Sequence, residues 1–215
     1  MSIYIPRPFA IDERASVARL IHDHPFATLV TPGAPEPHIT HLPLIHVADC
    51  EPHGTLFGHF ARANPHAEVP RAIESIAIFH GPHAYVSPSW YAERAAAVPT
   101  WNYAVVHAHG TIDFAAEPAQ TRAVLDLLIQ RFEGTRPQPW QLGLEGRSLA
   151  AMIGAIVGFR IKLTRVEAKY KMSQNRPQGD RVRVAAALDA EGYAEATATA
   201  AWMRTLQGNA KDAAD

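Results

Sequence analysis

Short apolar runs, separated by turn residues, fill most of the chain between residues 26 and 114. Proline and glycine stand between the runs, as at Pro32-Gly33 and Gly81-Pro82, and both residue types favour turns because of their special φ preferences. Several short strands at close spacing favour an antiparallel barrel or sandwich over a parallel sheet. The strands that we expect here span 26–31, 38–47, 54–60, 75–81, 83–87 and 101–114.

Helical periodicity occurs near the N-terminus, in an insertion at about 115–155, and again near the C-terminus. In the insertion, Pro118 suits the first turn of a helix in which Val124 and Leu127 share one face. After the insertion, the alternation along 156–173 predicts a half-buried strand. The expected helices span 12–24, 118–133, 147–155 and 180–188, and the tail 191–215 is expected to be helical or frayed.

The composition is that of an ordinary globular protein, with 215 residues, 47% hydrophobic and 19% charged. This length suits one sizeable domain, which we place at 1–190 with the tail as an appendage. The net charge of −1 does not favour DNA binding, which usually needs a strongly basic face, although DNA stays open as a partner. Apolar runs are too short to span a bilayer, no signal-peptide pattern opens the chain, and Cys50 is a lone cysteine. We therefore expect a cytoplasmic protein without a membrane partner.

Hydrogen-bond donors are concentrated in two blocks, GHFARANPH (58–66) and KMSQNRP (171–177). Such side chains rarely serve a core, because each buried donor without a partner costs about 1–3 kcal/mol. Together they suit a phosphate or a carbonyl-bearing ring, which predicts one anionic ligand held from two sides. Arg62 offers a planar fork that matches phosphate oxygens. The alternative is a solvated Arg62 in a turn, with Asn64-Pro65 starting a helix.

Two further segments combine aromatic rings with polar side chains, YVSPSWY (85–91) and VPTWNY (98–103). Ser87, Trp101 and Asn102 suit a planar ring and its polar edge. Alternatively, the aromatic residues are packing anchors and Ser87 is a helix cap. The 12 histidines invite a metal site, but no HExxH motif or cysteine pair accompanies them. A phosphate-binding glycine loop and a nucleophile beside a base are also not evident.

These blocks, in this order, resemble the PaiB family of FMN-binding negative transcriptional regulators. The segments that carry the resemblance are YIPRPF (4–9), THLPL (40–44), GHFARANPH, YVSPSWY, VPTWNY and KMSQNRP. The resemblance implies a mainly β protein with helices (α+β), namely a six-stranded antiparallel Greek-key split barrel related to pyridoxamine-phosphate oxidase. It also implies a homodimer with FMN bound at the interface.

The resemblance further implies which side chains contact FMN. His41 and Leu42 would line the flavin ring, and Arg62 would hold the phosphate. The other residues implied in cofactor binding are His59, Ala61, Asn64, Ser87, Trp101, Asn102, Ser173, Gln174 and Arg176. The last three belong to KMSQNRP, which either touches FMN or instead braces the dimer or caps the last helix.

The expected function is that of a dimeric, FMN-binding transcriptional regulator. The alternative is a flavin-dependent oxidoreductase that acts on an unknown small molecule, since bound flavin performs redox chemistry without a protein acid or base. The paired basic residues with which pyridoxamine-phosphate oxidase binds its substrate are not evident in this sequence. Oxidation of pyridoxamine phosphate is therefore not implied.

Overall fold

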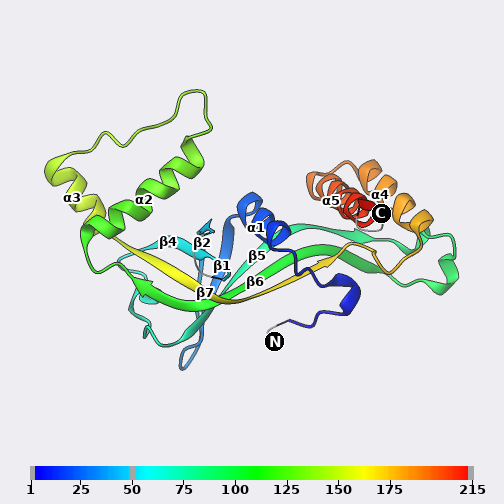
Figure 1. Ribbon diagram of the computed structural model, residues 1–215, viewed down its shortest axis with the longest axis horizontal. Coiled ribbons are helices and arrows are strands. Elements are labelled where there is room, and N and C mark those ends of the chain that lie inside the picture. The colour runs from blue at the N-terminus through cyan, green and yellow to red at the C-terminus, as the bar shows by residue number, and fades with distance from the viewer. Residues whose placement is uncertain (1–2, 49–51, 213–215) are drawn as a thin grey trace. The chain divides into compact units, whose positions relative to one another are not determined.

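The computed structural model describes residues 3–48 and 52–212, and Cys50 lies outside these ranges. It shows a mixed α+β chain built on a seven-stranded sheet in the order β2-β1-β5-β6-β7-β4-β3 (Figure 1). The strands are β1 (Phe26–Thr31), β2 (His38–Pro43), β3 (Ile45–Val47), β4 (Thr55–Ala61), β5 (Glu74–Val86), β6 (Thr100–Phe114) and β7 (Ile156–Lys171). β1 pairs antiparallel with β2 and β5, and β4 pairs antiparallel with β3 and β7. The expectation of six strands was therefore wrong.

The single strand expected over 38–47 divides at Leu44 because the chain changes its pairing partner there. β2 pairs with β1, whereas β3 pairs with β4. Leu44 itself is fully buried, and its N–H donates to the carbonyl of Pro25 at 2.9 Å. Because of this change of partner, the segment forms two strands where one was predicted.

The two strands expected at 75–81 and 83–87 are one continuous strand, β5, so the turn predicted at Gly81-Pro82 was wrong. Proline normally interrupts a strand inside a sheet because it has no N–H to donate. The pairing of β5 with β1 ends at Phe79, opposite Ala27, and Pro82 lies beyond it. The missing N–H of Pro82 therefore breaks no bond to β1.

The helices follow the predicted periodicity closely. They are α1 (Arg14–Asp23), α2 (Pro118–Glu133), α3 (Gly146–Gly154), α4 (Gln178–Glu191) and α5 (Ala194–Asp212). Short 3₁₀ turns lie at η1 (Arg7–Phe9), η2 (Pro65–Glu68), η3 (Pro88–Trp90) and η4 (Arg94–Ala96). Gly192 ends α4 with φ 74°, a left-handed conformation that glycine adopts without strain, and α5 packs against α4. The tail is thus helical through Asp212.

Two compact units share the three long strands β5, β6 and β7. The first contains the residues up to 13, 80–105, and those from 168 onward; the second contains 14–79 and 106–167. The core of the second unit includes Phe60 stacked on Phe159, with ring centroids 4.5 Å apart. In the first unit, Tyr170 lies edge-on to Trp202 at 5.2 Å. The expected domain of 1–190 with a separate tail stays a prediction.

At Gly110, β6 leaves no room for a side chain against the backbone of β7. A Cβ atom at this position would lie 2.3 Å from the carbonyl oxygen of Lys162 and 2.7 Å from Cγ2 of Ile161. Gly110→Ala is therefore expected to lower the free energy of unfolding by about 2 kcal/mol, because backbone must shift to admit the methyl group. Urea denaturation measures the loss. Gly143→Ala is the matched control, since nothing within 4 Å meets its Cβ; equal stability of the two variants would contradict the packing argument.

Candidate functional site

A buried hydrogen-bonded cluster fixes the turn that follows β4. At its centre is His66, whose side chain is 1% exposed. Its Nε2 lies 2.8 Å from Oγ1 of Thr31, and its Nδ1 lies 2.9 Å from Oγ1 of Thr40. Asn64 joins the cluster because its amide donates to Thr40 Oγ1 at 3.1 Å and its Oδ1 accepts from the His66 N–H at 3.0 Å. Asn64 thereby caps η2, which confirms that Asn64-Pro65 starts a helical turn.

His66 is a neutral base in this cluster. Burial, assisted by the nearby His38, lowers the pKa of His66 from 6.5 to about 4. Its ring also stacks on Phe60 at a centroid distance of 4.9 Å. No role was predicted for His66 from the sequence, although its place directly after Asn64-Pro65 was a usable signal. We refer to His66, Thr31, Thr40 and Asn64 as the His66 hub.

Arg62 binds backbone carbonyls where α3 ends and β7 begins. Its backbone N–H donates to Ala155 O at 2.8 Å, its Nε to Gly154 O at 2.5 Å, and its Nη2 to Ile156 O at 2.9 Å. A guanidinium is favourable here because the carbonyls at a helix C-terminus carry partial negative charge. These bonds use two of the five guanidinium N–H donors, and Arg62 remains exposed. The side chain is therefore held in place while donors remain for an anion.

The neighbouring predicted residues of β2 and β4 differ in their surroundings. His59 and Ala61 share one face of β4, and Nδ1 of His59 is a buried atom with no hydrogen-bond partner among the residues described. Burial lowers the pKa of His59. His41 is exposed beside Thr28, with 3.1 Å between its Nδ1 and Oγ1 of Thr28. Leu42 is 5% exposed and belongs to the core, so its contact with a flavin ring stays a prediction.

The predicted residues of the first unit lie around the turn from β7 to α4. Asn102 is fully buried and exchanges hydrogen bonds with Oγ of Ser173 at 3.1 and 3.2 Å. Gln174 closes the turn by accepting from Met172 N at 2.6 Å and donating to the carbonyl of Tyr170. Ser173 adopts a φ of 64°, which the turn requires. These contacts hold the turn itself, and no side-chain hydrogen bond caps α4 at Pro177, so the capping role considered for KMSQNRP was wrong. A contact of KMSQNRP with FMN stays a prediction.

Arg176, the third predicted residue of KMSQNRP, lies with its guanidinium carbon 4.5 Å from the ring centroid of Tyr91. This is a cation–π contact. Ser87 caps η3, because its Oγ accepts from the N–H of Ser89 at 3.2 Å. Both side chains therefore have structural partners in the first unit, and their contacts with FMN stay predictions.

Trp101 presents an open aromatic surface in the first unit. It is 53% exposed and lies edge-on to Tyr85, with ring centroids 6.3 Å apart. Lys171 donates to Oγ1 of Thr100 and to the carbonyl of Trp101, both at 2.6 Å. Burial, together with the nearby Lys169 and Arg176, lowers the pKa of Lys171. The exposed indole offers a flat apolar surface to a planar ring.

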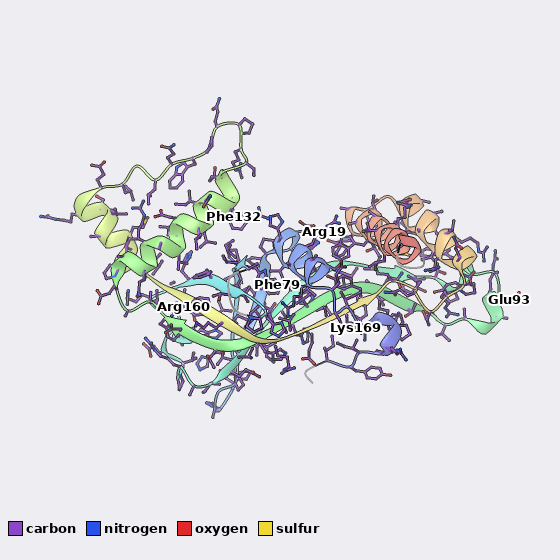
Figure 2. All side chains as sticks on the ribbon, in the orientation of Figure 1. Arg19, Phe79, Glu93, Phe132, Arg160 and Lys169 are labelled. Carbon is purple, nitrogen blue, oxygen red and sulfur yellow. The ribbon has the colours of Figure 1, made fainter. Side chains whose placement is uncertain are left out.

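Lys169, two residues before Lys171 on β7, is a second lysine in contact with aromatic residues (Figure 2). Its Nζ donates to the Tyr4 carbonyl at 2.9 Å and lies 5.5 and 5.3 Å from the ring centroids of Tyr4 and Tyr103. Its charge is therefore held by a carbonyl and two aromatic faces.

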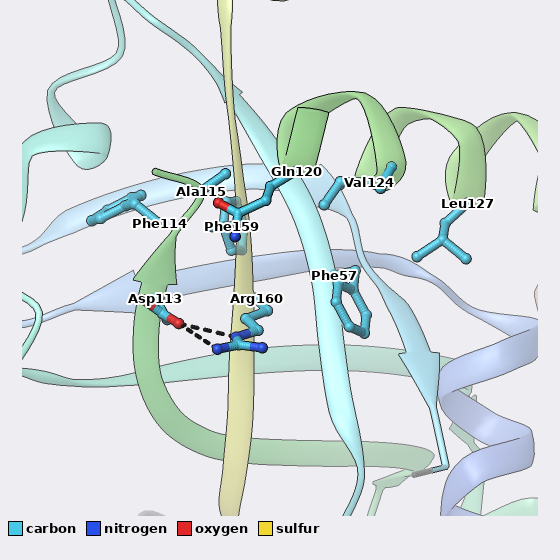
Figure 3. A pocket seen from close by; sticks show the side chains of 10 residues that line it. Phe57, Asp113, Phe114, Ala115, Gln120, Val124, Leu127, Phe159 and Arg160 are labelled. Carbon is cyan, nitrogen blue, oxygen red and sulfur yellow. Dashed lines mark hydrogen bonds and ion pairs between the residues drawn. The ribbon is translucent and has the colours of Figure 1, made fainter. Parts of the chain in front are cut away.

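A cavity of about 220 Å³ lies in the second unit between α2 and the strands β4, β6 and β7 (Figure 3). Phe57, Phe114, Val124 and Leu127 contribute to its apolar lining, and the ion pair of Asp113 with Arg160 adjoins it. This cavity was not predicted from the sequence, because its walls come from segments about 30 to 100 residues apart.

Neither a metal site nor a membrane-spanning helix is found among the described residues. Within 3–48 and 52–212, no group of three or more His, Cys, Asp or Glu side chains is placed to hold a metal ion. In the same ranges, no helix has the length and apolar character needed to cross a membrane.

The residues present fit FMN in chemical kind. In the second unit, the exposed Arg62 guanidinium suits a phosphate, and the unpartnered Nδ1 of His59 suits a polar ring edge. In the first unit, Trp101 offers an aromatic surface. Each requirement of a flavin nucleotide, namely charge neutralisation, apolar contact and edge hydrogen bonds, thus has a candidate.

Comparison with solved structures supports the fold. The flavocytochrome Anf3 from Azotobacter vinelandii superposes with a TM-score of 0.62 at 11% identity, covering 83% of this chain and 78% of that one. A FAD- and heme-binding protein from Mycobacterium smegmatis gives a TM-score of 0.60 at 15% identity, covering 80% of this chain and 78% of that one. At such low identity the likeness establishes the fold alone.

Sequence comparison identifies the family. Residues 3–165 match the family described as "Putative FMN-binding domain". The "Protease synthase and sporulation protein PAI 2" of Bacillus subtilis is 35% identical over 192 residues, which cover 88% of this chain and 90% of that protein. An uncharacterised protein of Aspergillus fumigatus is 30% identical over 216 residues, covering 76% of this chain and 82% of the other. The chain belongs to the PaiB-type family of FMN-binding domains, as its sequence motifs predicted.

Proposed function

We propose that this protein is a negative transcriptional regulator that binds FMN at the interface of a homodimer. The observation that carries the proposal is the exposed guanidinium of Arg62, held by the carbonyls of Gly154 and Ile156 within the segment that matches the FMN-binding family. A pre-positioned cation loses little side-chain freedom when it binds a phosphate. The relative from Bacillus subtilis is named for protease synthesis and sporulation, which supports a regulatory role.

In this proposal the residues have separate tasks. Arg62 holds the phosphate, and the His66 hub keeps the turn that carries Arg62 in one conformation. His59 bonds to the polar edge of the ring through the nitrogen that lacks a partner. In the first unit, Trp101 offers an exposed aromatic surface, and Asn102 and Ser173 brace the turn from β7 to α4. FMN, when bound, supplies reversible electron transfer, which suits a regulator that responds to redox state.

Purified protein tests the cofactor directly. We expect flavin absorbance bands at about 370 and 450 nm, a higher melting temperature on addition of FMN, and the mass of a dimer by light scattering. If saturating FMN neither produces bound absorbance nor raises the melting temperature, the cofactor part of the proposal fails. If the protein binds FMN as a monomer, only the dimer part of the proposal fails.

A flavin-dependent oxidoreductase is the second candidate. It is favoured by the hollow of about 310 Å³ beside Trp101, which His80 and His83 also line and where a small substrate has room. Catalytic oxidation of NADH or NADPH by the FMN-loaded protein would favour this candidate. Binding to DNA that weakens steeply with added salt would favour the regulator, because phosphate contacts release counterions.

A further inference from the structure

The cavity beneath α2 has the properties of a second ligand site. We propose that it binds a small organic acid, a single ring or short acyl chain that carries one carboxylate. All of its walls belong to the second unit, and the proposal does not rest on FMN. Arg62 and the His66 hub do not line it.

The walls determine the size and the apolar part of the ligand. Phe57 of β4 and Phe159 of β7 face Val124 and Leu127 of α2 across the cavity (Figure 3). Pockets for drug-sized ligands usually measure roughly 300–1,000 Å³. A volume of about 220 Å³ is smaller, so it suits one ring or a chain of a few carbons.

The charges at the cavity favour an anion. Asp113 lines the cavity and accepts from two arginines: Nη2 of Arg160 lies 2.8 Å from Oδ2, and Nη1 of Arg71 lies 3.1 Å from Oδ1. One carboxylate therefore faces two guanidinium groups, which leaves a net charge of +1 in this trio. Arg160 directs Nε and Nη2 to Asp113, so its Nη1 keeps donors for a second carboxylate.

The first turn of α2 also favours an anionic ligand in the cavity. Oε1 of Gln120 accepts from the N–H groups of Ala116 at 2.8 Å and Glu117 at 3.2 Å. The orientation of the amide is thereby fixed, and its NH₂ group is the part left to donate inside the cavity that Gln120 lines. The positive end of the α2 dipole lies at this turn and also favours negative charge. A cationic ligand would meet Arg160 and an Asp113 that is already paired.

A fluorine-labelled acid tests the proposal on the full-length protein, saturated with FMN if it binds FMN. We expect 4-fluorobenzoate to bind at the cavity in a ¹⁹F NMR titration. It should bind about tenfold more tightly than 4-fluorobenzamide, because only the acid forms a charge-assisted pair with Arg160. Equal binding of acid and amide, or no binding of the acid up to millimolar concentration, would overturn the proposal.

Three variants locate the binding. Leu127→Trp fills the cavity and should abolish binding of both compounds. Arg160→Gln should remove the tenfold preference for the acid while Asp113 keeps Arg71 as its partner. Arg122→Gln is the matched control, since Arg122 pairs with Asp126 on the same helix without lining the cavity. Binding of the acid that survives both cavity variants would place it elsewhere and refute the site. Flavin absorbance, read in every sample, reports separately on the FMN proposal.

Discussion

Replacement of His66 by leucine is expected to lower the free energy of unfolding by about 1–3 kcal/mol. The change leaves the buried hydroxyl of Thr31 and the hydroxyl of Thr40 without the imidazole nitrogens that they contact at 2.8 and 2.9 Å. Thr31 keeps Ser75 and Thr40 keeps Asn64 as partners, so the loss is that of two hydrogen bonds at about 0.5–1.5 kcal/mol each. Chemical denaturation at pH 7 measures the loss. His83→Leu, at an exposed histidine, should change stability by less than about 0.5 kcal/mol.

The same residue predicts how stability depends on pH. An unfolded His66 takes up a proton near its ordinary pKa of 6.5, whereas the folded protein keeps it neutral until the pH falls to about 4. The unfolded state binds more protons between these values, so stability is lost as the pH falls from 6.5 to 4. The shift corresponds to about 3 kcal/mol from this one group. The dependence should be clearly shallower in His66→Leu, and identical slopes in the two proteins would show that His66 is not its source.

Arg62→Ala is expected to weaken FMN binding by roughly 10- to 150-fold, which corresponds to about 1.5–3 kcal/mol for a hydrogen bond to a charged group. Fluorescence quenching of FMN during a titration measures the affinity. The variant should remain folded, because Arg62 is exposed and water can replace it at the carbonyls of Gly154 and Ile156. Arg62→Lys should recover part of the affinity, since it restores the charge without the planar fork.

Controls separate the phosphate contact from a general effect of charge. Arg122→Ala removes a cation from α2 and should leave FMN affinity unchanged. Unchanged affinity in Arg62→Ala would remove this residue from the phosphate site. The carbonyl-binding role of Arg62 would then be its whole contribution.

Local features of the fold were predictable, whereas features set by distant contacts were not. The α2 helix matched its predicted limits of 118–133 because proline placement and apolar periodicity are properties of adjacent residues. The fusion of two expected strands into β5 was missed, since it depends on where β1 stops pairing. The division at Leu44 was missed for the same reason, because β3 turns to β4.

In the candidate site too, residue types were predictable from the sequence, whereas contacts between distant residues were not. The donor-rich character of GHFARANPH was evident from residue types, yet the partners of Arg62 lie about ninety residues away at the end of α3. Residue types also identified KMSQNRP as polar, but they did not show that Ser173 and Gln174 bond to neighbours around a turn. Sequence thus indicated which side chains were unusual, and three-dimensional proximity determined the use of each.

Two sets of hydrogen bonds hold the turn after β4, one made by Arg62 and one by the His66 hub, and they respond differently to acid. A guanidinium keeps its charge throughout the physiological range, so the bonds from Arg62 to the α3–β7 junction persist as the pH falls. The His66 hub instead depends on a neutral imidazole and weakens once that ring is protonated. We therefore expect acid near pH 4 to release η2 from β1 and β2 while the turn stays attached to the start of β7.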